Sequence, residues 1–307
     1  MSALIERLRA EGAKRYHDRH RYHVLMHEGR LTREQLQQWV LNRYYYQTRI
    51  PIKDALILSK SEDAKFRRMW IRRIRDHDGD AEGEGGLAMW LRLAGGVGLD
   101  REEVASLSSV LPGVRAACDS YVELVRSRSL VEAVASSLTE FFAPDLMAKR
   151  VLAWEKHYPW VDRDMLTYFR SRVTRAWQDS TEAVDFVERH AITPELQDRC
   201  VQALIDKTQI LWKLLDSVYA AYVKPKLAAK AKLRYDRKAD RTMLLYPEKG
   251  LVLNPTAADT VALCTGEYTV GQIALELSEK YKNETARVEG DVISLVGSLA
   301  ERGLMHE

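Results

Sequence analysis

The stretch Asn42-Arg-Tyr-Tyr-Tyr-Gln47 lies inside a long helical pattern that begins at the capping box Thr32-Arg-Glu-Gln35. Helical spacing puts Arg43, Tyr46 and Gln47 on one face, where a buried helix would normally be apolar. A helix that points such side chains one way is typical of the wall of a polar cavity. The alternative is a tyrosine-rich core helix whose hydroxyl groups find partners inside the fold.

The sequence around this helix predicts a soluble, mainly α-helical protein. Of its 307 residues, 46% are apolar and 30% are charged, which is ordinary for a globular chain. Strand signals are nearly absent before residue 223, so we expect an all-α bundle over residues 1–223. Helical patterns are clearest at 64–76, 87–94, 113–128, 130–142, 162–190 and 194–222.

Composition excludes several other classes of protein. The net charge of +3 is too small to indicate nucleic acid binding. No uncharged apolar run approaches the roughly 20 residues of a membrane span, and the N-terminus lacks the apolar core of a signal peptide. Cys118, Cys200 and Cys264 are too far apart for a disulfide framework or a zinc finger, so we expect a cytoplasmic protein.

The pattern changes after the bundle. Residues 223–241 hold eight Lys or Arg against two Asp. We interpret 224–232 as a basic linker, with an interaction tail as the alternative. Residues 233–307 then predict a small winged-helix-like α+β domain. Its expected elements are strands at 242–246 and 250–253 around a turn at 247–250, and helices at 256–264, 269–281 and 288–302.

Further polar residues are candidates for the cavity that the helix face of Arg43, Tyr46 and Gln47 would line. Lys207 lies on the apolar stripe of the last bundle helix, so it needs an anion such as a bound carboxylate, unless it reaches the surface. Tyr168 and Arg172 share a helical face, and Arg offers a planar fork that suits a carboxylate; the alternative is a surface Arg beside a half-buried Tyr. No nucleotide loop or nucleophile elbow is present, so a polycarboxylate is the simplest ligand.

The histidines indicate acid–base chemistry more than metal binding. One group near the N-terminus resembles a metal cluster: His17, His20, His23 and His27. No acidic residue lies between the last two, so the zinc protease pattern fails and we expect no metal site. His77 lies between two aspartates, which favours its protonated form near neutral pH and suits an acid–base role; a solvated loop histidine is the alternative.

Taken together, these residues resemble the pyrroloquinoline quinone synthase family, which are cofactorless oxidases at the end of that cofactor's biosynthesis. The resemblance runs from Gly12 to about Tyr222. It implies a helical bundle of the haem-oxygenase-like, TENA/THI-4-like type without haem, and a homodimer. Blocks in the same order carry it: Asn42-Arg-Tyr-Tyr-Tyr-Gln47, Ile74-Arg-Asp-His-Asp-Gly79, Val110-Leu-Pro-Gly-Val-Arg115, Ser136-Ser-Leu-Thr-Glu140 and His157-Tyr-Pro-Trp160.

The C-terminal part resembles the small peptide-chaperone protein of the same pathway. Leu244-Leu-Tyr-Pro-Glu-Lys-Gly250 and Leu253-Asn-Pro-Thr-Ala-Ala258 carry this second resemblance. It implies a domain that binds the precursor peptide through a strand edge and presents it to the radical SAM enzyme that cross-links Glu and Tyr. The chain therefore looks like a natural fusion of synthase and chaperone.

The resemblance also implies roles for single residues. The synthase closes a ring in a bicyclic tricarboxylate that carries an amino group and a quinone. It then oxidises this precursor with dioxygen to pyrroloquinoline quinone, releasing hydrogen peroxide and using no cofactor. His77 is the acid–base candidate, and Tyr168 and Arg172 would face dioxygen. Carboxylates and quinone oxygens would be held by Arg43, Lys53, Arg150, Arg172 and Lys207. The hydrogen-bonding walls would be completed by Tyr16, His17, Tyr46, Gln47, Tyr121 and Thr139.

One position departs from the family pattern. Met147 stands where the family usually carries a histidine of the dioxygen-binding group, and a methionine cannot donate a hydrogen bond. We therefore expect slower dioxygen-dependent steps, unless His77 or a water molecule compensates.

Two other classes of function stay open. The first is a non-catalytic carrier of a carboxylate-rich small molecule whose C-terminal domain recruits partners. The second is a helical-bundle enzyme of thiamin salvage, which would need a nucleophilic cysteine; Cys118 and Cys200 lack a supporting set of residues.

Overall fold

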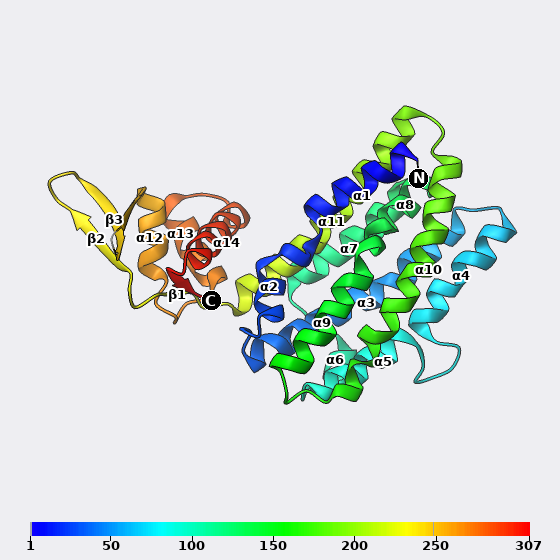
Figure 1. Ribbon diagram of the computed structural model, residues 1–307, viewed down its shortest axis with the longest axis horizontal. Coiled ribbons are helices and arrows are strands. Elements are labelled where there is room, and N and C mark those ends of the chain that lie inside the picture. The colour runs from blue at the N-terminus through cyan, green and yellow to red at the C-terminus, as the bar shows by residue number, and fades with distance from the viewer. Residues whose placement is uncertain (1, 248) are drawn as a thin grey trace. The chain divides into compact units, whose positions relative to one another are not determined.

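The computed structural model describes residues 2–247 and 249–307, without the side chains of residues 174–179 (Figure 1). The chain divides into two compact units, Met1–Leu215 and Asp216–Glu307. Helices make up the regular structure that is described in the first unit, and the second unit combines strands with helices. The predicted mainly α fold class is therefore confirmed. None of the described helices is both long enough and apolar enough to cross a bilayer.

A long helix, α3 (Arg33–Ser59), organises the first unit by packing against α4, α5 and α7 (Figure 1). The predicted capping box at its start is confirmed: the Thr32 hydroxyl accepts from Gln35 N at 3.2 Å, and the Gln35 side chain accepts from Thr32 N at 2.9 Å. The other helical elements are α1 (Ala3–Arg15), η1 (His17–Arg19), α2 (Arg21–His27), α4 (Ala64–Asp78), α5 (Gly85–Gly96), α6 (Arg101–Ser106), α7 (Pro112–Ser127), α8 (Leu130–Ser136), η2 (Ser137–Phe142), α9 (Ala143–His157), η3 (Arg163–Leu166), α10 (Thr167–His190) and α11 (Pro194–Tyr222).

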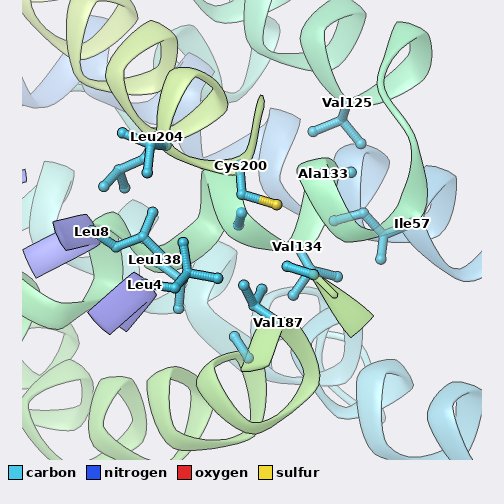
Figure 2. Packing of buried hydrophobic residues seen from close by; sticks show 14 of the residues in the cluster. Leu4, Leu8, Ile57, Val125, Ala133, Val134, Leu138, Val187, Cys200 and Leu204 are labelled. Atoms are coloured by element: carbon cyan, nitrogen blue, oxygen red, sulfur yellow. The ribbon is translucent and has the colours of Figure 1, made fainter. Parts of the chain in front are cut away.

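The main apolar core joins the first and last helices of this unit. Leu4 and Leu8 of α1, Ile57 of α3 and Leu204 of α11 are buried in one cluster with Cys200 (Figure 2). Burying a side chain of this size stabilises a fold by about 1.5–3 kcal/mol. This core contains the C-terminal, apolar end of α3. The polar middle of that helix lies outside this apolar cluster.

The helix predictions for residues 130–190 need correction. Residues 130–142 form α8 followed by the 3-10 helix η2, and α10 begins after a second 3-10 turn, η3. The helix α9 was not predicted. Pro144 lies in its first turn, where the missing N–H of proline is tolerated. This matters for the site, because η2 and α9 both contribute to the cavity described below.

The second unit packs three helices with a small antiparallel sheet of strand order β2-β3-β4. The Asn254 side chain accepts a hydrogen bond from Ala257 N at 2.8 Å and caps the first helix. The predicted strands and helices are present, whereas β2 was not predicted, and part of the predicted turn at 247–250 lies outside the described residues. The elements are β2 (Lys232–Asp236), β3 (Arg241–Tyr246), β4 (Lys249–Leu253), α12 (Pro255–Leu263), α13 (Val270–Tyr281) and α14 (Thr285–Glu301).

The basic segment after the bundle has structure of its own. It contains β1 (Lys226–Leu227), which pairs with β5 (Met305–His306) in an antiparallel arrangement. Ala228 and Ala231 are buried. The segment interpreted as a linker thus takes part in the second unit, while the exact domain boundaries inferred from composition stay predictions.

Candidate active site

A polar cavity of about 80 Å³ lies among the helices of the first unit. The polar face of α3 forms one wall, and η1, η2, α9 and α10 contribute the others. Most of the predicted site residues line it: Tyr16, His17, Arg43, Tyr46, Gln47, Thr139, Arg150, Tyr168 and Arg172. The other predicted residues lie outside the lining that the structure describes: Lys53, His77, Tyr121 and Lys207.

The cavity wall is strongly cationic. Arg43 is 8% exposed and Arg150 2% exposed, and neither lies within 4 Å of a carboxylate among the described residues. Burial, reinforced by the charge of Arg43, lowers the pKa of Arg150 to about 9. The wall therefore holds buried guanidinium charge that has no carboxylate partner among the described residues. Such charge is costly unless an anion binds beside it.

Lys207 lies behind this wall between two tyrosine rings. Its Nζ donates to the Tyr46 hydroxyl at 2.9 Å and lies 3.4 Å from the centre of the Tyr121 ring. The two rings are nearly parallel, with centroids 6.4 Å apart. Burial, together with Arg43, holds the pKa of Lys207 well below its usual range. At 1% exposure Lys207 does not reach the surface. Its ammonium group contacts the Tyr121 ring and the Tyr46 hydroxyl, where we expected an anion.

Tyr168 and Gln47 form a polar pair across the cavity. The Tyr168 hydroxyl donates to Gln47 Oε1 at 2.8 Å. The Tyr168 ring packs edge-on against Trp90 with centroids 4.8 Å apart. Burial raises the pKa of Tyr168, although nearby Arg172 opposes that shift. Tyr168 is 4% exposed, so it is buried, whereas the alternative expected a half-buried tyrosine beside a surface arginine.

Lys53 is neutralised by the protein itself. Its Nζ lies 2.7 Å from Asp54 Oδ1 and donates to Ser137 Oγ at 3.1 Å. The same Asp54 oxygen accepts from Trp70 Nε1 at 2.8 Å. Burial alone would lower the pKa of Lys53, but the charges of Asp54, Tyr121 and Glu140 together outweigh burial, so the pKa is raised. Lys53 therefore belongs to an internal ion pair and does not line the cavity.

Glu140 is a cavity residue to which sequence reasoning assigned no role. Two oxygens of its carboxylate accept from Arg73 Nη1, at 2.8 and 3.0 Å. Burial would raise the pKa of Glu140, but Arg73, Lys53 and Arg172 outweigh it and lower the pKa. Glu140 stays ionised and is the one carboxylate among the described lining residues. In the sequence, Glu140 could be noticed only as the last residue of the block Ser136-Ser-Leu-Thr-Glu140. That block does not predict its ion pair with Arg73.

His77 is buried at the end of α4, at 2% exposure. Its Nδ1 lies 3.0 Å from the carbonyl oxygen of Arg73, so Nδ1 carries the proton and donates. Nε2 has no hydrogen-bond partner among the described residues. Burial, with a contribution from Arg172, holds the pKa of His77 well below its usual range. The expectation of a protonated or solvated His77 was wrong, because burial outweighs the neighbouring aspartates; the ring is a neutral base with a free lone pair.

The N-terminal histidines lie close together without forming a metal site. The described residues contain no group of three or more His, Cys, Asp or Glu side chains placed to bind a metal ion. His20 Nδ1 accepts from Tyr22 N at 3.0 Å and thereby caps α2. Burial, with Arg43 or Arg150 adding to it, holds the pKa of His17 and of His23 well below its usual range. His17 and His23 are therefore neutral near pH 7.

Met147 lines the cavity next to Arg150. Its Sδ lies 3.8 Å from Arg150 Nη1. Sulfur is a weak acceptor and methionine has no donor. The position identified as a departure from the family pattern therefore touches the cationic wall directly.

Comparisons with known proteins agree with this fold. The model of the TENA/THI-4/PQQC family matches residues 5–217, and the model of coenzyme PQQ synthesis protein D matches residues 241–305. The fold of the first unit resembles a haem-oxygenase-like domain from Shewanella denitrificans, with a TM-score of 0.58 at 16% identity, covering 71% of this chain and 91% of that one. It also resembles a TenA homologue from Pseudomonas syringae, with a TM-score of 0.54 at 15% identity, covering 70% and 90% of the two chains.

The chain belongs to the TENA/THI-4/PQQC family. Among curated relatives, it is 38% identical to the bifunctional coenzyme PQQ synthesis protein C/D of Methylorubrum extorquens, over 97% of this chain and 93% of the relative. It is 49% identical to the pyrroloquinoline-quinone synthase of Acidiphilium cryptum, over 72% of this chain and 89% of the relative. The predicted resemblance to both proteins of the pathway is thus confirmed, and it extends over almost the whole chain.

Proposed function

We propose that the helical unit is a pyrroloquinoline-quinone synthase, an oxidoreductase that completes the cofactor from a bicyclic tricarboxylate precursor. The observation that carries this proposal is the pair of buried cavity arginines, Arg43 and Arg150, which have no carboxylate within reach among the described residues. A ligand with several carboxylates and quinone oxygens neutralises such a wall, because Arg binds carboxylates through a planar fork. The curated relatives named above support the same activity.

The residues of the site divide the chemistry between them. His77, neutral with a free Nε2 lone pair, is the group suited to abstract the proton that ring closure requires. In each oxidation two electrons and two protons leave the precursor and convert one dioxygen to hydrogen peroxide. Tyr168 and Arg172 would stabilise the negative charge that develops on dioxygen. Under this proposal no cofactor takes part.

Substrate binding requires a rearrangement of the site. The cavity holds about 80 Å³, whereas ligand pockets commonly hold about 300–1,000 Å³. His77 and Lys207 lie outside the lining, so movement of the walls that admits the precursor would also bring these two groups to it. Excluding water after such a movement suits an oxidation that passes through reactive oxygen species.

We also propose that the second unit binds the precursor peptide and presents it to a radical SAM enzyme. In the strand order β2-β3-β4, one edge of β4 has no partner strand among the described residues. A free edge accepts an extended peptide through main-chain hydrogen bonds. The match to coenzyme PQQ synthesis protein D supports this assignment. A homodimer in the cytoplasm belongs to the same proposal.

A non-catalytic carrier is the second candidate, and Met147 favours it, because the corner of the cavity beside Arg150 lacks a hydrogen-bond donor at this position. A thiamin-salvage enzyme is disfavoured, since burial raises the pKa of Cys118 and of Cys200 to about 12 and keeps both thiols unreactive.

The deciding experiment mixes the full-length protein with the bicyclic precursor in air and follows absorbance and peroxide. Several turnovers with peroxide release support the synthase. A single spectral change that stops at one equivalent of ligand supports the carrier and contradicts the synthase. Titration with the precursor peptide in parallel tests the second unit independently.

A further inference from the structure

His23 lies directly behind the cavity wall. It belongs to α2 and is 1% exposed. Its Nδ1 lies 3.0 Å from the carbonyl oxygen of His17, and its Nε2 lies 3.2 Å from Nη2 of Arg150. A carbonyl oxygen only accepts hydrogen bonds, and a guanidinium only donates them. His23 is therefore a neutral imidazole with its proton on Nδ1, and its Nε2 lone pair accepts from Arg150.

Arg150 has little else to hold it in place. Its Nη1 reaches only the weak acceptor Met147 Sδ, at 3.8 Å, and its Nε has no partner among the described residues. Its Cζ lies 4.7 Å from the centre of the Trp39 ring and 5.4 Å from that of the Phe169 ring. These contacts attract the cation but do not fix the rotation of its plane. Within the part of the chain that is described, Nε2 of His23 is thus the one nitrogen or oxygen atom that accepts from this guanidinium.

We propose that His23 is a positioning residue, which orients the Arg150 guanidinium so that its remaining N–H groups meet a carboxylate or quinone oxygen of the ligand. The inference rests on the proposed function, since it states how one cation of that site is held. A planar fork binds a carboxylate with two parallel hydrogen bonds only when its plane is correctly turned. The bond from His23 to His17 ties this orientation to a second residue of the cavity wall.

The neighbouring histidines do not share the role. His20 is used as the cap of α2. The His27 ring lies 5.9 Å from that of His23, and neither of its nitrogens has a hydrogen-bond partner among the described residues. Because both nitrogens of His23 are engaged, the three rings of His17, His23 and His27 cannot pass a proton along without breaking the bond to Arg150. A positioning role therefore fits His23 better than a proton relay.

The test is binding of pyrroloquinoline quinone to full-length protein, measured by equilibrium titration beside single-turnover oxidation of the precursor. His23→Gln keeps an acceptor near the position of Nε2, so its affinity should stay within about threefold of the unmodified protein. His23→Asn keeps the bond to the His17 carbonyl but cannot reach Arg150. It should weaken binding about tenfold or more, the size expected for losing a hydrogen bond to a charged group. His27→Met, on the same helix, is the matched control and should leave the affinity unchanged.

Arg150→Lys provides the second measurement. If His23 acts through Arg150, His23→Asn should weaken binding no further once Arg150 has been replaced; independent, additive losses would overturn the inference. Equal losses in His23→Gln and His23→Asn would indicate a packing role and overturn it too. Should His23→Asn not fold, His23→Leu fills the same space without an acceptor and replaces it. If the unmodified protein binds the quinone and His23→Asn binds equally well, the inference alone fails; if the unmodified protein neither binds nor turns over, the proposed function fails with it.

Discussion

Two sets of buried cations lie in the helical unit, and they differ in what neutralises them. Lys53 and Arg73 have carboxylates of the protein beside them, Asp54 at 2.7 Å and Glu140 at 2.8 Å. Arg43 and Arg150 have none within 4 Å among the described residues, although they are buried too. The charges of a buried ion pair neutralise each other when the chain folds. A buried cation without a carboxylate partner is neutralised only when an anionic ligand binds. The first set therefore stabilises the fold around the site, and the second set is available to bind an anionic ligand.

The largest expected effect comes from breaking the self-neutralised set. Asp54→Asn keeps an acceptor for Trp70 but leaves the Lys53 ammonium, 2% exposed, without its counter-charge. We expect a loss of about 3–5 kcal/mol in the free energy of unfolding, measured by urea denaturation. Lys53→Met combined with Asp54→Asn is the control and should recover part of the loss. A single variant as stable as the unmodified protein would contradict the distinction between the two sets.

Breaking the other set should leave stability intact and remove binding. Arg43→Met removes a buried charge whose Nη1 has no partner in the described chain, while the methionine can still pack on the Tyr46 ring. We expect affinity for pyrroloquinoline quinone to fall by about 2–3 kcal/mol, or roughly 30- to 150-fold, with no loss of unfolding free energy. Arg49→Met, on the same helix but paired with Asp119 at 3.6 Å, is the control. Lower stability without weaker binding would refute the prediction.

This division shows where sequence reasoning succeeded and where it stopped. The polar face of α3 could be predicted because helical spacing depends only on the local chain. The pairing of Lys53 could not, since adjacent residues do not face each other on a helix and only the long lysine side chain lets its Nζ reach Asp54. Arg73 and Glu140 are brought together from α4 and η2 by tertiary packing, which one sequence does not encode as a pattern. His77 was misjudged for the same reason: its burial comes from distant elements.

Ligand binding should stabilise the folded protein measurably. If product binding supplies the missing counter-charge, pyrroloquinoline quinone at a hundred times its dissociation constant should stabilise the folded protein by about 2.7 kcal/mol. Thermal unfolding with increasing ligand measures this shift. A neutral quinone without carboxylates is the control and should give little or none. No shift with the tricarboxylate at saturation would mean that the cationic wall does not need an anion.

The cationic wall should also make the fold sensitive to mild acid. Burial, together with nearby cations, lowers the pKa of His17, His23 and His77 in the folded protein, and that of His27 to about 3. Below about pH 6.5 the unfolded chain takes up protons that the folded protein does not, so stability is full above that pH and falls as the pH drops. Each such histidine contributes at most about 1.4 kcal/mol per pH unit.

Urea denaturation at pH 7.5, 6.0 and 5.0 measures this slope. His77→Gln removes one group that titrates only when unfolded, so its stability should depend less steeply on pH. His190→Gln, a replacement at an exposed position, controls for the loss of a histidine as such. Stability that rises on acidification through this range would contradict the neutral, buried state of these rings.

The smallest effect concerns Met147, which lies beside Arg150 on the cationic wall and has no hydrogen-bond donor. Met147→His would put an imidazole N–H beside Arg150, able to stabilise the negative charge developing on dioxygen. One such donor is worth roughly 100- to 1,000-fold where it acts alone. Since Tyr168 and Arg172 line the same cavity, we expect only about a threefold to tenfold faster oxidative phase, followed by peroxide release in single turnover. Met147→Leu, which adds no donor, should leave the rate unchanged. An equal rate in Met147→His would mean that this corner of the cavity does not limit the dioxygen-dependent steps.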